Sequence, residues 1–345
     1  MRSQTRREFL CRTIPAAVAT GTALAVVPFS YSQAPPPAVT QRGYSAGKLA
    51  LELDGQFAGW LKSANGGHAF ADVVTQGATV NGTQRKHLAG VKYEDIVLTC
   101  GTGMSPSLYE WIKASFDKQS IRRNGSLVAC DYNYKAQSWQ NWFNTSISEI
   151  AFPACDAASK EPGNFTISLT PEEIQWKKGV GEDLLGGRKP STKESNWLPS
   201  NFRLSISGLD CSRVNKIEAI TAATSVKQAP DSGMRQSLGA ASSMQMSSLA
   251  VTLAETDAGG FFRWMQDSMA GRQTSSGPGN AGKSGVLEFL DPSLRETLFS
   301  LSFFGLGINQ LVPEALSAHS EQIRRVKAVM SYKDLRFAYG AAASA

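Results

Sequence analysis

Histidine and cysteine are scarce in this sequence, which limits the metal and redox chemistry that it can support. Its 345 residues contain three histidines and five cysteines. Beyond the N-terminal region these residues stand singly, without C-x-x-C spacing: His68, His87, His319, Cys100, Cys130, Cys155 and Cys211. We therefore expect no metal site and no cofactor. In an oxidising compartment the four cysteines permit three pairings, and their spacing does not choose among them.

Concentrated positive charge is also missing from most of the chain. The formal net charge is +6, but four arginines and one glutamate give residues 1–32 a charge of +3. The other 313 residues share the remaining +3, and no basic cluster is interleaved with aromatic residues. This weakly basic balance does not indicate a nucleic-acid partner.

No apolar run in the chain is long enough to predict a membrane span. The stretch Ile14–Phe29 has 16 residues, whereas a span needs about 20. It follows a sequence of twin-arginine form, whose candidate export residues are Arg6, Arg7, Phe9 and Leu10. We expect residues 1–32 to be a cleaved signal peptide and 33–44 a Pro-rich linker. The predicted location is periplasmic or extracellular; the cleavage position, and the alternative of an anchoring or disordered arm, stay open.

One string invites a nucleotide-binding interpretation. GPGNAGKS (277–284) fits the phosphate-loop pattern G-x-x-x-x-G-K-[ST] at every position. In a true phosphate loop, a buried strand precedes the glycines and a helix begins on the last residues. The interpretation therefore depends on which elements flank the string.

Two segments with helical spacing of apolar residues stand 153 positions apart, SLYEWIKASF (107–116) and GFFRWMQDSM (260–269). Each is predicted to be a helix whose apolar stripe packs on a sheet. The predicted packing residues are Leu108, Trp111, Ile112, Phe116, Phe261, Trp264, Met265 and Met269.

The same spacing extends to the predicted strands around these helices. At an offset of 153, the alternating patterns of 49–55 and 96–100 fall on 202–208 and 249–253. At 160, RRNGSLVACD (122–131) falls on GKSGVLEFLD (282–291), and Trp139 and Phe143 fall on Phe299 and Phe303. At 161, Ile174, Trp176 and Gly179 fall on Leu335, Phe337 and Gly340. We infer an internal duplication, with domains over 45–180 and 199–341 and a linker over 181–198.

The duplication changes how several residues are interpreted. GPGNAGKS follows a predicted helix and precedes a predicted strand, the reverse of a phosphate loop, so nucleotide binding is not expected. Cys100 and Cys130 align with leucines and are expected in the core, whereas a bridge between Cys155 and Cys211 stays open. The sequence has no G-x-S-x-G motif, and Glu172-Glu173 lies in a turn-like TPEE. We expect no catalytic residue and no enzyme.

The first copy resembles the tail-tube proteins of contractile phages. The resemblance covers roughly residues 45–180. The second copy matches the family more weakly, and its assignment rests mainly on its register with the first copy. The matching segments are LALELDGQFAG (49–59), KYEDIVLTCG (92–101), LYEWIKASF (108–116), IRRNGSLVACD (121–131) and WFNTSISEIAFP (142–153).

This resemblance implies a mainly β fold, with two tandem β-sandwich or partial-barrel domains that each pack one α-helix. It also implies six-fold rings whose strands join edge to edge and stack into a hollow tube, which removes exposed strand edges. A fused pair would place three chains in a pseudo-hexameric ring. A relative of this fold supplies the expelled tube of type VI secretion systems.

Two features depart from the family pattern, the duplication and the export signal. A phage tube assembles in the cytoplasm and needs no export signal. We therefore predict a structural protein that self-assembles into a tube outside the cytoplasm. Two alternatives stay open: an exported, non-polymerising binding module, and the inner tube of a phage tail or injection system. Residues 75–91 and 227–245 are predicted to be long loops that contact the next ring, or mobile loops without a partner.

Overall fold

The computed structural model describes six stretches of the chain. They lie within one compact unit over residues 44–345. The described residues are 47–76, 85–184, 197–225, 243–270, 282–315 and 323–340. The predicted export residues therefore lie outside them. Within these stretches, the helices are too short or too polar to cross a membrane.

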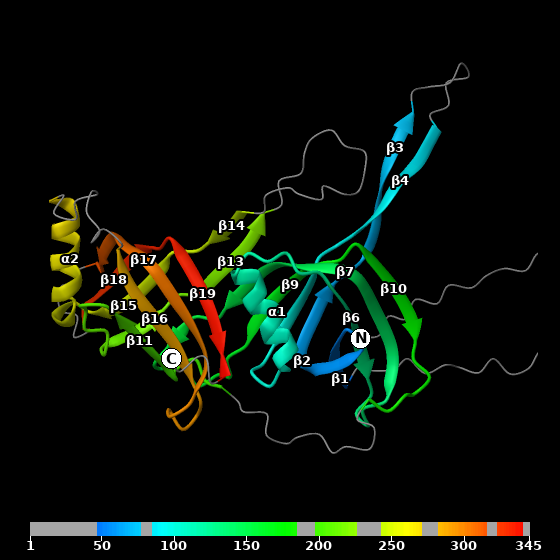
Figure 1. Ribbon diagram of the computed structural model, residues 1–345, viewed down its shortest axis with the longest axis horizontal. Helices are drawn as coiled ribbons and strands as arrows, with labels where there is room; N and C mark the ends of the chain where they lie inside the picture. Colours follow the sequence, from blue (N-terminus) through cyan, green and yellow to red (C-terminus); the bar gives the residue numbers. More distant parts are fainter. Residues whose placement is uncertain are drawn as a thin grey trace, which may run out of the picture. The chain divides into compact units, whose positions relative to one another are not determined.

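The first half, up to residue 184, consists of strands and one helix that lies beside them (Figure 1). Its elements are β1 (Lys48–Leu53), β2 (Gln56–Gly66), β3 (Ala69–Gln76), β4 (Arg85–Tyr93), β5 (Ile96–Cys100), α1 (Pro106–Phe116), β6 (Arg123–Cys130), β7 (Ala136–Phe152), β8 (Cys155–Asp156), β9 (Phe165–Thr170) and β10 (Glu173–Lys178).

The second half, from residue 197, has the same kinds of element in nearly the same order. They are β11 (Phe202–Ile206), β12 (Val214–Ile217), β13 (Ile220–Ser225), β14 (Ser243–Met246), β15 (Leu249–Ala254), the 3-10 turn η1 (Glu255–Asp257), α2 (Gly259–Met269), β16 (Lys283–Leu290), β17 (Thr297–Pro313), β18 (Arg325–Ser331) and β19 (Asp334–Tyr339). The bounds of α1 shifted by 153 are those of α2, and the bounds of β6 shifted by 160 are those of β16.

Each half forms a barrel-like sheet, which confirms the predicted fold class. In the first half the pairings run β7-β6-β1-β2-β5-β9 and return from β9 to β7, so they close a cycle. In the second half they run β11-β16-β17-β18-β15-β12 and stay open between β11 and β12. Alternate residues of each strand enter the core, as in Leu51 and Leu53 of β1.

The two helices differ in how far they are buried. Pro106 at the first position of α1 has the fixed backbone angle that a helix start requires. The four predicted packing residues of α1 are all buried. In α2, Phe261 and Trp264 are buried and Met265 is partly buried, but Met269 is 77% exposed. The expectation that Met269 packs in the core is wrong, because within the described chain nothing covers that end of α2.

The long strands β7 and β17 correct the predicted alignment by one residue. Gly125 lies opposite Trp142, and its counterpart Gly285 lies opposite Phe303. The offset here is therefore 161 rather than 160, and Trp139 and Phe143 do not correspond to Phe299 and Phe303. The turn before β17 is one residue longer than the turn before β7. Since side chains alternate between the faces of a strand, a one-residue slip exchanges the faces.

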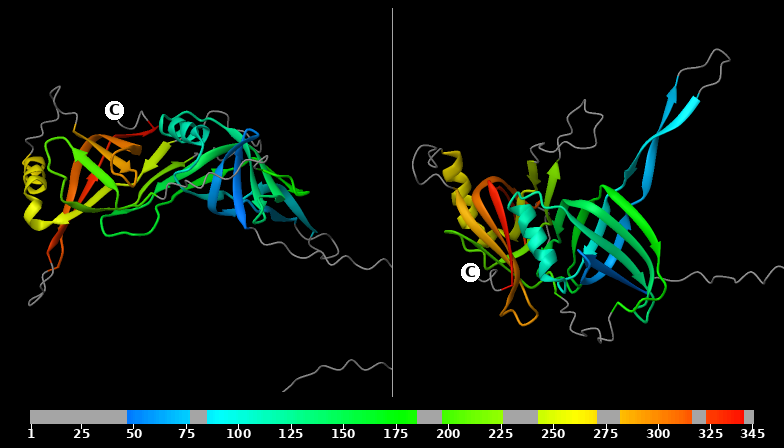
Figure 2. Two further views of the ribbon diagram at one scale, coloured as in Figure 1. Left: turned by 90° about the horizontal axis from the view of Figure 1, so that it is seen from below. Right: turned by 45° about the vertical axis from the view of Figure 1, so that its right-hand side comes forward.

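The predicted loop over 75–91 is largely a hairpin of β3 and β4. Both strands project from the rest of the first half (Figure 1; Figure 2, right). They form a two-stranded sheet of their own, with exposed apolar residues along both strands. The last three residues of the other predicted loop, 243–245, lie in β14 (Ser243–Met246), which pairs with β13 in the same register that β4 has with β3. Residues 77–84 and 226–242 lie outside the described residues.

Candidate functional site

The most extensive feature that joins the two halves is a shared β-ladder. β6 pairs with β7 only as far as Thr145, and β9 occupies the opposite edge of β7 over Ser146–Ala151. β13 of the second half then pairs with β7 in antiparallel register, from Ile220 opposite Phe152 to Ala223 opposite Glu149. A strand of one half thus continues the sheet of the other, with main-chain hydrogen bonds across the junction.

Aromatic side chains fill the space beside this ladder. The helix α1 packs on β19, where the Tyr109 ring stacks on Tyr339 with centroids 5.2 Å apart. The Phe337 ring lies 5.9 Å from Phe116 and 5.8 Å from Phe152. Phe116 and Phe152 are each 2% exposed and Phe337 is 3% exposed. Aromatic pairs at these distances add about 0.5–1.5 kcal/mol each beyond the burial of their area.

Polar contacts border the aromatic cluster. The Tyr339 hydroxyl donates to Oε1 of Glu110 at 3.3 Å, and Lys118 lies 3.6 Å from Asp334. Burial is the main cause that raises the pKa of Tyr339, and the Glu110 carboxylate raises it further. These exposed pairs contribute little stability, so the rings and the shared ladder hold the halves together.

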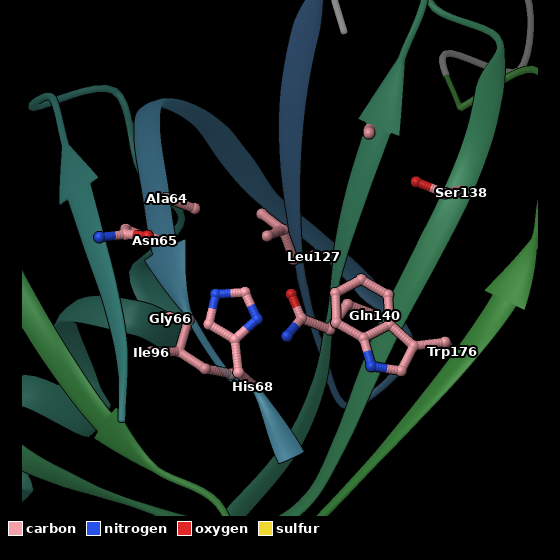
Figure 3. A pocket seen from close by; sticks show the side chains of 10 residues that line it. Ala64, Asn65, Gly66, His68, Ile96, Leu127, Ser138, Gln140 and Trp176 are labelled. Carbon is pink, nitrogen blue, oxygen red and sulfur yellow. The ribbon is translucent and has the colours of Figure 1, made fainter. Parts of the chain in front are cut away.

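A second feature is an open cavity of about 220 Å³ on the first half. Its lining includes small or polar residues of β2, β6 and β7, together with His68 and the exposed ring of Trp176. Figure 3 shows the His68 imidazole and the Trp176 indole on either side of Gln140. Gln140 donates to the carbonyl of Gly67 at 3.4 Å. The lining also contains Ser138 of β7.

The corresponding place in the second half is filled rather than hollow. Ala129 and Ser138 of the cavity correspond to Phe289 and Phe299, by offsets of 160 and 161. These two rings stack with their centroids 4.3 Å apart in the core. The first half therefore has room where the second half has side chains.

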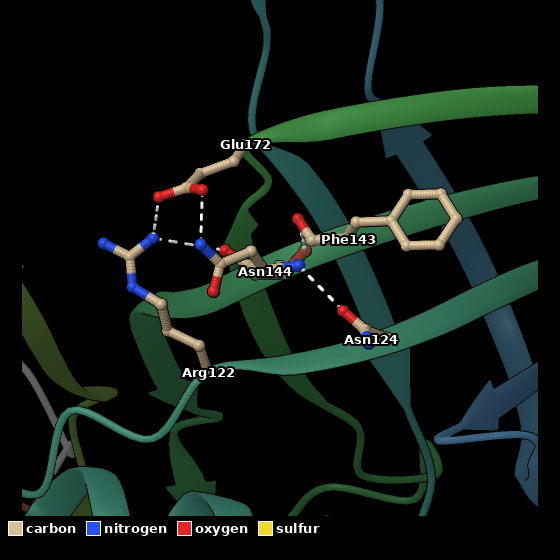
Figure 4. Close-up of polar contacts among 6 residues, drawn as sticks. Arg122, Asn124, Phe143, Asn144 and Glu172 are labelled. Carbon is tan, nitrogen blue, oxygen red and sulfur yellow. Dashed lines mark hydrogen bonds and ion pairs between the residues drawn. The ribbon is translucent and has the colours of Figure 1, made fainter. Parts of the chain in front are cut away.

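Of the acidic pair Glu172-Glu173, Glu172 lies in a polar cluster, and Glu173 accepts a hydrogen bond from Gln175. Glu172 accepts hydrogen bonds from Arg122 and from the side-chain amide of Asn144 (Figure 4). The backbone N–H of Asn144 donates to the side-chain oxygen of Asn124 at 2.9 Å. Asn144 has a φ of +50°, and Gly305 occupies the equivalent position with a φ of +66°. The cluster fixes a kink in β7, which a glycine allows in β17 without side-chain support.

The four described cysteines carry free thiols, and all are buried. Burial is the largest cause that raises their pKa values, to about 11 for Cys130 and Cys211 and about 12 for Cys155. Burial also raises the pKa of Cys100. Such thiols stay protonated at neutral pH and are poor nucleophiles. The described residues also contain no group of three or more potential metal ligands.

The phosphate-loop string ends at the start of a strand. Gly282 and Lys283 are described, and the residues 277–281 before them are not. α2 precedes the string and β16 begins at Lys283, which is the predicted order. Nζ of Lys283 donates to the carbonyl of Ser207 at 2.8 Å and lies 5.5 Å from the ring centre of Trp264. This lysine therefore links the first turn of the second half to its helix.

The residues that form the junction could not be recognised from the sequence patterns. Tyr109, Phe152 and Phe337 had no assigned role across the halves, although the apolar pattern placed their neighbours in the core. Trp197, in the predicted linker, is fully buried against Phe289, with ring centroids 5.3 Å apart. One signal for the junction was present in the sequence. The offset of 161 aligns Phe337 with Trp176, so this position carries a large aromatic residue in both halves, although Trp176 is exposed.

Comparison with known proteins gives similarity of fold only. No family model and no curated protein sequence matches the chain. A chain of the sheath-tube complex of an extracellular contractile injection system, PVC, in the extended state is 15% identical, with a TM-score of 0.36, and the match covers 40% of this chain and 94% of that chain. The anti-feeding prophage tube-terminating cap is 19% identical, with a TM-score of 0.36, over 41% of this chain and 99% of that one. Hcp1 from Flavobacterium johnsoniae is 14% identical, with a TM-score of 0.27, over 38% and 96%.

Proposed function

We propose that this protein is a structural subunit that associates with copies of itself, through its sheet edges, into rings and a tube. The observation that carries the proposal is the shared ladder between β7 and β13. In it, a strand of the second half is added to the sheet of the first half. A chain with two such units in tandem contains one junction. The surfaces that this junction does not use could form a second junction with another chain.

The free strand edges of the described residues support this proposal. β3 pairs with β4 on one edge and has no strand on the other. β17 pairs with β18 as far as Pro313, but β16 stops at Leu306 on the opposite edge. Unpaired edges of this kind promote uncontrolled association unless another strand covers them. Head-to-tail contacts between copies cover them and produce closed rings when the rotation closes.

For this chain we propose three copies per ring, with six similar units over 45–180 and 199–341, and stacking of rings into a hollow tube. The two units would descend from an internal duplication, joined by the linker over 181–198. No cofactor and no catalytic step is part of this role. The matched chains come from the sheath-tube complex of an extracellular contractile injection system and from the tube-terminating cap of the anti-feeding prophage. A tube role for this chain is proposed.

Light scattering and negative-stain imaging of the purified protein test the proposal. We expect trimers with six lobes, and stacks of them at higher concentration. Proteolytic cleavage between residues 185 and 196 is expected to leave the particles intact, because the β7–β13 ladder and the aromatic cluster hold the halves together. A monomer that persists at millimolar concentration would contradict the proposal and favour a non-polymerising binding module.

We also propose that the chain is exported by the twin-arginine machinery, from the pattern that contains Arg6 and Arg7. Replacing both arginines by lysine is expected to leave the full-length precursor in the cytoplasm. Cell fractionation and mass measurement of the N-terminus check this, with a substitution of Arg2 alone as the control. Normal processing of the double variant would show that this pattern is not the signal.

A further inference from the structure

The junction inside the chain consists of two complementary surfaces. We call α1 together with the end of β7 the front surface of the first half. We call β19 together with β13 the rear surface of the second half. The front surface supplies Tyr109, Phe116, Phe152 and the free edge of β7, and the rear surface supplies Phe337 and a strand that pairs with that edge.

Because the two halves repeat the same elements, each half has both surfaces. The front surface of the second half is α2 with the end of β17, and the rear surface of the first half is β10 with β3. The offsets of 153 for the helices and 161 for β7 and β17 pair the following front residues: Tyr109 with Phe262, Phe116 with Met269, and Phe152 with Pro313. The offset of 161 also pairs Phe337 of the rear surface with Trp176.

The paired positions are apolar in both halves but differ sharply in exposure. Phe337 is almost fully buried, whereas Trp176 is 62% exposed. Phe116 is buried, whereas Met269 is exposed, and Pro313 is exposed where Phe152 is buried. A large exposed aromatic residue at the position of a buried one indicates a surface that binds a partner.

We propose that the front surface of the second half binds the rear surface of the first half in another copy of this chain, and repeats the internal junction. This inference rests on the proposed self-assembly and specifies its contact. The occupant is a second copy, since the chain already contains the complementary surface and shows how the two fit.

The internal ladder predicts the strand register between copies. Ile220 to Ala223 of β13 correspond to Gly67 to Phe70, and their partners on β7 correspond to Gln310 to Pro313. The hairpin partners agree with this alignment, because Ala69 lies opposite Tyr93 and Ala222 lies opposite Met246. His68 is therefore opposite Val312, Ala69 opposite Leu311 and Phe70 opposite Gln310. Pro313 has no N–H to donate and ends the ladder.

The side chains predict a second cluster at this contact. Trp176 of one copy would lie against Phe262, Met269 and Pro313 of the other, as Phe337 lies against Tyr109, Phe116 and Phe152. The cavity beside Trp176 gives room for these side chains where the second half is filled by Phe289 and Phe299. Trp176 is thus expected to be the anchor of the contact.

One polar pair of the internal junction has no favourable counterpart between copies. Glu110 and Tyr339 correspond to Arg263 and Lys178, which carry the same charge. Salt screens repulsion between exposed charges. We therefore expect the contact between copies to strengthen as the salt concentration rises, and the variant Arg263→Glu to assemble at a lower salt concentration than the wild type.

Substitution of the anchor is the first test. Trp176→Glu is expected to raise the concentration for half-assembly by about 30-fold or more, since loss of a buried aromatic anchor commonly costs over a tenfold change in affinity. Tyr132→Glu is the matched control, because Tyr132 is 73% exposed and lies outside both surfaces. Circular dichroism and thermal unfolding of each variant show whether the fold is intact. A folded Trp176→Glu variant that assembles like the wild type would overturn the inference.

Cysteine pairing tests the register independently. Chains with His68→Cys are mixed with chains with Val312→Cys, and a disulfide-linked dimer is expected on a non-reducing gel after mild oxidation. His68→Cys mixed with Leu311→Cys is the control, because that neighbour points to the opposite face of the strand. No linkage in a sample whose wild-type form makes rings would contradict this contact while leaving self-assembly supported. A wild-type chain that stays monomeric would contradict both.

Discussion

Replacing Trp111 by alanine is expected to lower the free energy of unfolding by about 3–5 kcal/mol, the usual cost of removing a large buried aromatic side chain. Trp111 is fully buried where α1 meets the core of the first half. Its indole Nε1–H donates to the carbonyl of Ile121 at 2.9 Å, which ties the helix to the segment before β6. Urea unfolding followed by circular dichroism measures the loss.

Trp264 is the matched position in the second half, and it makes the comparison sharper. It is buried as well, but its indole N–H has no hydrogen-bond partner among the described residues. Trp111→Phe removes the hydrogen bond to the Ile121 carbonyl, and a typical intramolecular hydrogen bond contributes about 0.5–1.5 kcal/mol. Trp111→Phe should therefore destabilise the protein more than Trp264→Phe. Equal losses in the two phenylalanine variants would show that the hydrogen bond to Ile121 contributes nothing.

Replacing Phe337 by alanine is expected to cost a similar amount, about 3–5 kcal/mol, for a different reason. The ring contributes to the junction of the halves, where Tyr109, Phe116 and Phe152 surround it. Its removal leaves a cavity between two sheets that share a ladder, so unfolding should begin there. Differential scanning calorimetry is expected to show a lower transition temperature and a separation of the two halves.

The control for Phe337 is its own counterpart. Trp176→Ala should change the stability of the unassembled chain by no more than about 0.5 kcal/mol, because Trp176 is exposed in a single copy. At concentrations where copies associate, the same substitution should weaken the assembly. A large loss of stability in dilute Trp176→Ala would mean that this side chain supports the first half itself.

The sequence was sufficient to predict local structure. Alternation at 49–55 and 96–100 predicted β1 and β5, and helical spacing around Trp111 and Trp264 predicted α1 and α2. These patterns are read within a few residues of the chain, so a single sequence contains them. The constant offset between similar segments also predicted the order of strands and helices along the second half, but not which strands pair.

Contacts across the halves could not be predicted in this way. The turn before β17 is one residue longer than the turn before β7, which shifts the alignment of the two strands by one residue. Trp139 and Phe299 are both aromatic, so the sequence pattern alone aligned them with each other. The pairing of β13 with β7 joins residues about 70 positions apart, and no periodicity records which edge a strand will meet. For the same reason, the alignment showed Trp176 and Phe337 as equivalent but could not show that only one of them is covered.

The shared ladder also constrains how the chain can fold as it is made. β10 ends at Lys178 and β19 ends at Tyr339, so the ribosome adds 161 residues between the completion of the two halves. At about 5–20 residues per second, the first half waits roughly 8–30 s for the strands that cover it. β13, which pairs with the edge of β7, is complete at Ser225, but the rings of Tyr109 and Phe116 wait until β19 is made. Because neighbouring chains on one messenger would carry the same uncovered rings, we expect contacts between them to compete with the contact inside each chain.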